Sequence, residues 1–234
     1  MKSYNGYTEF FGGLRLPRRF WLRSLQAVAM TLLLLLPIGA TANAVPAAGG
    51  TGAHVYLLRG VLNIFSLGLD DIAAKLQAQG IPTTVVNYLS WSSLADEAAA
   101  DYRSGKVRTI ILVGHSSGAT VLPDMVARLD QLGAPVKLAI GLDSVFRTSL
   151  SGRVGRYINF YIGNGNGEPV ARTGQLRGSL ENVNVQNVPG VGHITIDKNE
   201  IMQRKVISAI DAVAFGSRSS EASAMPRPEA RAAR

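Results

Sequence analysis

Apolar positions along the chain fall into two patterns, short continuous runs and longer stretches with a helical period. Short runs rich in β-branched and aliphatic residues are typical of strands buried on both faces. Stretches with apolar residues three and four positions apart are typical of helices that cover such strands. The predicted strands span 54–58, 83–88, 109–113, 136–142, 158–162 and 183–188, and the predicted helices span 67–79, 92–104, 117–132 and 201–214.

The order of these elements predicts the fold class. Continuous apolar strands that alternate with helices indicate an α/β fold, with a mostly parallel central sheet covered by helices on both faces. Active sites in such sheets collect at the carboxyl ends of the strands. Residues 216–234 are rich in Ser, Ala, Pro and Arg and predict a disordered tail, which leaves 45–215 as the folded domain.

Residues 1–44 have a different character. A basic region with an arginine pair at 18–19 ends at Arg23, an apolar stretch spans 25–40, and the small-residue pattern Ala-Asn-Ala ends at Ala44. This order predicts a cleaved secretory signal and an exported protein, periplasmic or secreted. The arginine pair resembles a twin-arginine signal, and both export routes stay open. The alternative is an uncleaved anchor in the inner membrane, although the apolar stretch is shorter than the roughly 20 residues of a spanning helix.

Composition narrows the possible chemistry. The chain has no cysteine, which excludes disulfides, a thiolate nucleophile and cysteine metal ligands. Its three histidines, His54, His115 and His193, do not have the spacing of metal ligands, so we expect no metal site and no cofactor. Half of the formal net charge of +8 lies in residues 1–44. The remaining charge is spread thinly, which argues against a nucleic-acid partner.

One strand end carries a catalytic motif. Gly114-His115-Ser116-Ser117-Gly118 directly follows the apolar run 109–113 and directly precedes a predicted helix. Gly-x-Ser-x-Gly in a strand–turn–helix context holds a serine hydroxyl above the sheet on a sharp, strained turn. Gly114 and Gly118 leave room there because they have no side chain to clash with the neighbouring strand and helix. The motif therefore predicts Ser116 as a nucleophile, and the alternative is an ordinary tight turn.

With this motif and this order of elements, the chain resembles the α/β-hydrolase superfamily over about residues 54–214. The superfamily includes esterases, lipases and thioesterases, and the resemblance implies a catalytic triad in the chain order serine, acid, histidine. His193 is the only histidine downstream of Ser116 and lies in a glycine-rich loop, so it is the expected base. His54 precedes the serine, and His115 is expected to pack or to hydrogen-bond locally.

Two carboxylates are candidates for the acid. Asp143 directly follows the strand 136–142, a placement that resembles the thioesterase domains of the superfamily. Many members carry the acid one strand later, where Glu168 is the nearest carboxylate in this chain. We favour Asp143 because a strand end positions a side chain more rigidly than the glycine-rich loop that holds Glu168. A turn-capping role is the alternative interpretation of Asp143.

Two backbone N–H groups are expected to bind the oxyanion of the reaction intermediate. One belongs to Ser117, at the start of the helix that follows the nucleophile. The other is expected from the loop after the first strand, where Arg59-Gly60 resembles the His-Gly turn of the superfamily with arginine in place of histidine. Val61 is the first candidate in this loop and Leu62 the second.

These residues predict a serine hydrolase that cleaves an ester or thioester through an acyl-enzyme. The expected partner is a small-molecule or lipid-like acyl substrate, with membrane contact only through the signal segment if it stays uncleaved. The stretch 144–157, where many relatives insert a lid, is short and predicts a minimal or absent lid. Its arginines, Arg147, Arg153 and Arg156, are either a solvated surface or a site for a phosphate or carboxylate. The alternative function is a hydrolase-like envelope protein that binds a partner without catalysis.

Overall fold

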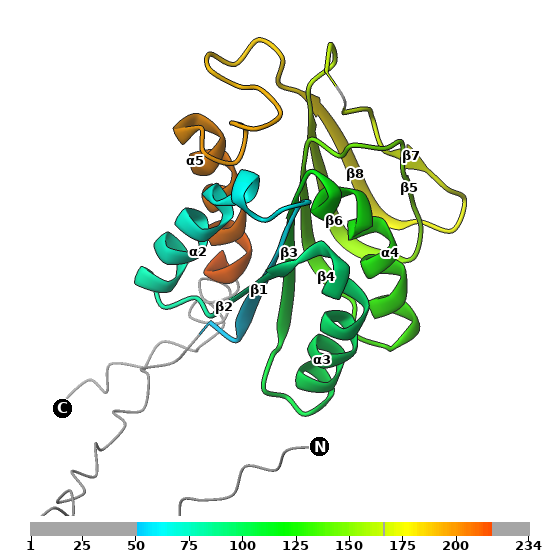
Figure 1. Ribbon diagram of the computed structural model, residues 1–234. Helices are drawn as coiled ribbons and strands as arrows, with labels where there is room; N and C mark the ends of the chain where they lie inside the picture. The colour runs from blue at the N-terminus through cyan, green and yellow to red at the C-terminus, as the bar shows by residue number, and fades with distance from the viewer. Residues whose placement is uncertain (1–50, 166, 217–234) are drawn as a thin grey trace, which may run out of the picture. The chain divides into compact units, whose positions relative to one another are not determined.

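The computed structural model describes residues 51–165 and 167–216, so the predicted signal segment and the predicted tail beyond Gly216 lie outside it. Six strands form one sheet in the order β2-β1-β3-β4-β6-β8, and every neighbouring pair is parallel (Figure 1). The strands are β1 (Ala53–Arg59), β2 (Thr83–Asn87), β3 (Thr109–His115), β4 (Val136–Leu142), β6 (Arg153–Tyr161) and β8 (Arg177–Asn184), and the helices are α2 (Gly68–Ala78), α3 (Trp91–Arg103), α4 (Ser117–Gln131) and α5 (Glu200–Ala214). The predicted α/β class is confirmed.

Helices cover both faces of the sheet, α2 and α5 on one side and α3 and α4 on the other (Figure 1). The continuous apolar run of β3 contributes side chains to the core on both faces of the sheet, because successive side chains of a strand point to opposite sides. Ile111 and Val113 pack in the cluster with α2 and α5, and Ile110 and Leu112 pack in the cluster with α3 and α4. None of the helices in the described ranges is both long and apolar enough to cross a bilayer.

The last two crossovers of the sheet use extended chain in place of a helix. The connection from β4 to β6 contains β5 (Ser149–Leu150), and the connection from β6 to β8 contains β7 (Ala171–Arg172). These two short strands pair in parallel as a separate sheet, and Leu150 and Val170 pack in the core cluster that contains α4. No helix is inserted between β4 and β6, as the expected minimal or absent lid requires.

Two strands were predicted at the wrong positions. β6 begins at Arg153 and not at residue 158, and β8 spans Arg177–Asn184 and not 183–188. Both errors arise because exposed arginines interrupt the first half of β6 and exposed polar residues occupy most of the edge strand β8, so neither strand is a continuous apolar run. Arg153 and Arg156 therefore lie in a strand, where they form ion pairs with Asp130 and Glu181 at 3.2 and 2.7 Å.

Candidate active site

The turn between β3 and α4 holds Ser116 in a strained backbone conformation, with φ 59° and ψ −123°. β3 ends at His115 and α4 begins at Ser117, so Ser116 alone makes the reversal. The packing around the turn requires glycine. A Cβ atom on Gly114 would lie 2.5 Å from the carbonyl oxygen of Gly118, and one on Gly118 would overlap the carbonyl oxygen of Leu58. A sharp turn of this kind presents the serine hydroxyl beyond the carboxyl end of the sheet.

Ser116, His193 and Asp143 form a hydrogen-bonded row. The hydroxyl group of Ser116 lies 3.0 Å from Nε2 of His193, and Nδ1 of the same ring lies 2.6 Å from Oδ2 of Asp143. An ionised carboxylate can only accept a hydrogen bond, so Nδ1 carries the proton and donates. This tautomer leaves Nε2 free to accept the hydrogen of the Ser116 hydroxyl, the arrangement that activates a serine.

Asp143 is completely buried at the end of β4. Its Oδ1 accepts a hydrogen bond from the N–H of Ile162 at 2.9 Å, and its own N–H donates to the carbonyl of Phe160 at 2.8 Å. Gly167 lies so close that a Cβ atom there would overlap Oδ1. Asp143 itself has a φ of 49°, a left-handed backbone conformation that aspartate tolerates better than most residues. Partners on both carboxylate oxygens offset the cost of removing the charge from water.

Glu168, the alternative acid, lies elsewhere. Its carboxylate accepts a hydrogen bond from the guanidinium of Arg147 at 2.6 Å, and its side chain is 45% exposed. The structure therefore brings Asp143, and not Glu168, to the imidazole of His193. Within the described residues no group of three histidine or carboxylate side chains could hold a metal ion.

The loop after β1 begins directly beside Ser116, since a Cβ atom on Gly60 would lie 2.8 Å from that of Ser116. The N–H of Gly60 donates to the hydroxyl of Ser66 at 2.9 Å and is therefore occupied. Among the hydrogen bonds of the described residues, none uses the N–H of Val61, Leu62 or Ser117 as donor. Arg59 forms a bidentate ion pair with Asp70 in the first turn of α2, which anchors the base of the loop.

His115, inside the serine motif, joins three separate segments. Its buried ring lies 2.8 Å from the hydroxyl of Ser66 through Nδ1 and 2.8 Å from the carbonyl oxygen of His193 through Nε2. Since a carbonyl only accepts, Nε2 carries the proton, and Nδ1 accepts from Ser66. The Ser66 oxygen in turn accepts from Gly60. His115 is packed inside the protein as one of the two expectations had it, but its hydrogen bonds are not local: they connect the loop beside Ser116 to the backbone of the proposed base.

Replacing His115 with alanine is expected to lower the free energy of unfolding by about 2–4 kcal/mol. The substitution leaves a cavity and removes the buried partners of Ser66 and of the His193 carbonyl. Urea unfolding followed by circular dichroism measures the change. Gly174→Ala is the control, because no atom lies within 4 Å of the new Cβ, and it should change stability by less than about 0.5 kcal/mol. A loss below about 1 kcal/mol for His115→Ala would contradict the network.

Burial of the His115 imidazole makes the stability of the protein depend on pH. Burial away from water lowers the pKa of His115 from its ordinary value of 6.5, against the opposing effects of Asp197 and the His193 carbonyl. The unfolded chain therefore takes up a proton at a higher pH than the folded chain does, so stability is lost as the pH falls below about 6.5.

We expect the urea midpoint of the wild-type protein to decrease between about pH 7.5 and about pH 5.5, and to decrease less in His115→Ala. His54, whose pKa burial also lowers, contributes to the decrease in both proteins. Equal decreases in the two proteins would show that His115 is not responsible.

The sequence did not indicate several residues of this site. The N–H of Ile162, the close approach of Gly167 and the hydroxyl of Ser66 all depend on how the chain folds back. The one available signal was the glycine repeat of 163–167, since glycines recur where a backbone approaches another group closely.

Comparisons with known proteins give structural similarity only. No family model matches the sequence, and a search of curated proteins finds no match. An acetylxylan esterase structure at 0.90 Å is 14% identical, covers 70% of this chain and 98% of its own, and has a TM-score of 0.46. An iodinated complex of acetylxylan esterase has the same identity and coverage with a TM-score of 0.43. The lin2722 gene product of Listeria innocua is 12% identical, with coverage of 66% and 92% and a TM-score of 0.45.

Proposed function

We propose that this chain is a serine hydrolase that cleaves an ester or thioester, with Ser116 as nucleophile, His193 as general base and Asp143 as the acid that orients it. The observation that carries the proposal is the row of hydrogen bonds from Ser116 Oγ to His193 Nε2 and from His193 Nδ1 to Asp143, at 3.0 and 2.6 Å. The strained backbone of Ser116 adds support, since strain of this kind gathers at functional sites.

In the first half of the reaction, Oγ of Ser116 attacks the substrate carbonyl carbon while its proton passes to Nε2 of His193. The N–H groups of Ser117 and Val61 bind the oxyanion that forms. The intermediate collapses, the bond to the leaving group breaks, and His193 gives its proton to the departing alkoxide or thiolate. Asp143 stays ionised throughout and stabilises the imidazolium.

In the second half, water attacks the acyl-enzyme carbonyl and gives a proton to Nε2 of His193. The oxyanion of this second intermediate accepts hydrogen bonds from the same two N–H groups. When the second intermediate collapses, Oγ of Ser116 leaves, takes the proton back from His193, and the carboxylic acid is released. His193 acts as base and then as acid in each half. Nε2 takes and returns the proton, while Nδ1 keeps its hydrogen bond to Asp143.

Labelling with a fluorophosphonate tests the proposal. The probe phosphonylates an activated serine, so the wild-type protein should carry the adduct on Ser116 when its peptides are analysed by mass spectrometry. Ser116→Ala should not be labelled, and Ser92→Ala, which changes an exposed serine of α3, should be labelled like the wild type. An unlabelled wild-type protein would favour the non-catalytic binding alternative.

We further propose that the protein is exported to the periplasm or beyond, on the strength of the sequence pattern in residues 1–44. Mass spectrometry of the protein isolated from the expressing cell is expected to find an N-terminus at Val45. An intact Met1 would contradict the predicted cleavage.

A further inference from the structure

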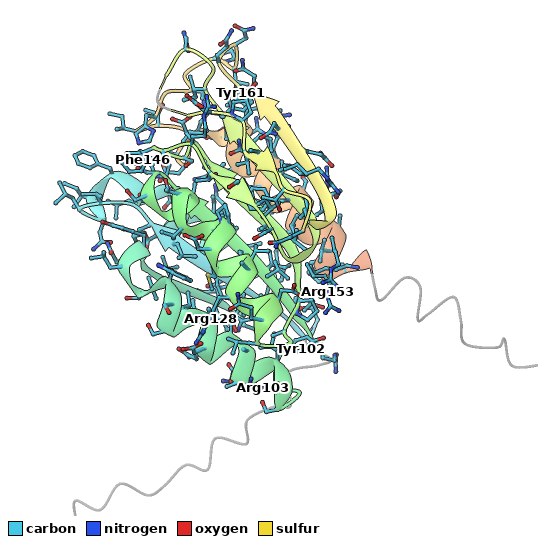
Figure 2. The ribbon with its side chains drawn as sticks, turned by 90° about the vertical axis from the view of Figure 1, so that its right-hand side faces the viewer. Tyr102, Arg103, Arg128, Phe146, Arg153 and Tyr161 are labelled. Atoms are coloured by element: carbon cyan, nitrogen blue, oxygen red, sulfur yellow. The ribbon has the colours of Figure 1, made fainter. Side chains whose placement is uncertain are left out.

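The large apolar side chains that the described surface exposes gather at one end of the molecule. They come from the loop 61–67 after β1, from Leu89 after β2, from Phe146 after β4, and from Ile194 beside His193, with exposures between 44% and 75%. We call these residues the apolar rim. All four segments follow the carboxyl ends of strands or adjoin the proposed base. Figure 2 shows Phe146 projecting from this end, opposite to Tyr102 and Arg103.

Hydrogen bonds join three of these segments to one another. Asn87, two residues before Leu89, donates through Nδ2 to Oδ1 of Asn63 at 2.8 Å. The Nζ of Lys198 donates to the carbonyl of Phe65 at 2.8 Å and to that of Ile194 at 2.9 Å. The loop 61–67 is thus continuous with Leu89 on one side and with Ile194 on the other.

Ser116 lies beside three of these segments. Gly60, where the loop after β1 begins, contacts Ser116, and Ile194 adjoins the His193 that bonds to it. The hydroxyl of Thr120 donates to the carbonyl of Ser116 and accepts from the N–H of Val145, the neighbour of Phe146, both at 3.2 Å. A long acyl substrate whose carbonyl reaches Ser116 therefore extends toward the apolar rim, whereas a small ester can reach Ser116 without depending on it.

Stability does not account for the apolar residues of the rim. Leu62 is 67% exposed and has a φ of 62°, so it gains little from burial and adopts a backbone conformation that disfavours leucine. Phe146 and Leu89 are 69% and 75% exposed. Exposed apolar side chains that gather at one end of a molecule mark a surface that meets an apolar partner.

Three of the charged side chains beside the rim are cations that already have partners, and Asp71 in the first turn of α2 adds one exposed carboxylate. Arg147 pairs with Glu168, Arg59 with Asp70, and the ammonium of Lys198 donates to two carbonyls and lies 3.6 Å from Asp197. This end of the molecule therefore offers apolar area with little free charge. Such a surface favours the apolar phase of a lipid aggregate over an anionic surface or a polar polymer.

We propose that the apolar rim seats the protein on a lipid aggregate and that the substrate class is a long-chain lipid ester presented by that aggregate. The inference rests on the proposed hydrolase function and narrows its substrate. The strongly exposed rim residues project into solvent, so they suit insertion into a lipid surface better than enclosure of one dissolved molecule. Insertion would bring the scissile carbonyl to Ser116 while the acyl chain stays in the apolar phase.

The test compares a polar rim variant with a matched apolar one. The polar variant combines Ile64→Thr, Leu89→Gln and Phe146→Gln, and the apolar control combines Ile64→Val, Leu89→Met and Phe146→Leu. Hydrolysis is measured with p-nitrophenyl acetate in solution and with p-nitrophenyl palmitate in detergent micelles. We expect the polar variant to lose at least tenfold on the micellar ester and to stay within about threefold on the soluble ester, with the control close to the wild type on both.

Equal losses on both esters, or no loss on the micellar ester, would overturn the proposal. Sedimentation with phosphatidylcholine vesicles tests the rim without catalysis, using Ser116→Ala with and without the polar rim substitutions. Residues 1–50 are the same in both proteins, so any difference reports the rim. The polar substitutions should reduce vesicle binding at least tenfold, and high salt should change binding less than twofold.

Other results would assign the rim to another partner. A wild-type dimer that the polar variant converts to a monomer, without any effect on vesicle binding, would show self-association and refute the lipid proposal. Binding that needs anionic lipid and is abolished by salt would refute the apolar mechanism. A wild-type protein that hydrolyses neither ester but binds vesicles through the rim would refute the hydrolase function and leave the lipid contact intact.

Discussion

Ser116→Ala is expected to reduce ester hydrolysis at least about a thousandfold while the fold is retained. The substitution removes the only group of the proposed triad that forms a bond to the substrate. His193 loses one hydrogen bond at a partly exposed position, so its contact with buried Asp143 should persist. Initial rates with p-nitrophenyl acetate measure the loss, and circular dichroism confirms that the fold is unchanged.

Two further variants sharpen this result. Ser116→Gly should be equally inactive and more stable than Ser116→Ala, because glycine adopts a φ of 59° and a ψ of −123° without strain. Ser92→Ala, on the exposed surface of α3, should keep activity within about twofold. Substantial activity in Ser116→Ala would remove the nucleophile assignment, and with it the proposed reaction.

Asp143→Asn is expected to reduce the rate by about a hundredfold to ten-thousandfold. The side-chain amide of asparagine presents a donor where the carboxylate accepts, which favours the wrong tautomer of His193 and leaves the imidazolium without its countercharge. Glu168→Gln is the matched control, because it neutralises the other candidate carboxylate. This control should retain activity within about threefold, since Glu168 contacts Arg147 and not His193.

Rates for both variants are measured across the pH range, together with urea unfolding at one pH. A large loss in Glu168→Gln with little loss in Asp143→Asn would reverse the assignment of the acid. If Asp143→Asn does not fold, its urea titration will show no cooperative unfolding transition. In that case Asp143→Glu, which keeps the charge but lengthens the side chain, provides the comparison: reduced but measurable activity is expected from it.

The central strands could be predicted because burial on both faces dictates their composition. β1, β3 and β4 contain continuous apolar runs, and the helices that flank them carry apolar residues at helical spacing. The strands β6 and β8 near one edge could not be placed as well. Their exposed polar residues, such as Arg156 and Glu181, pair with each other across the strands, a contact that only the folded sheet creates.

The site was predictable to the extent that it depends on local geometry. Ser116 follows from a five-residue motif, and Asp143 follows from its place at the end of an apolar strand. The buried connection through His115 was not predictable, because its partner Ser66 lies 49 positions away and neither residue differs from an ordinary core polar residue by sequence alone. Hydrogen-bond networks that join distant segments produce no periodic pattern of residues in a single sequence, so they cannot be predicted from it.

The three members of the proposed triad are not held with equal firmness. Ser116 and Asp143 extend neighbouring strands, whose ladder pairs His115 with Leu142. His193 lies on a loop outside the sheet, which side-chain bonds of His115 and Lys198 join to the rest of the fold. On gradual warming, this loop should open before the sheet melts. Heat inactivation would then set in below the melting temperature and reverse on cooling, so that a cross-link across the loop would extend the working range without altering the core.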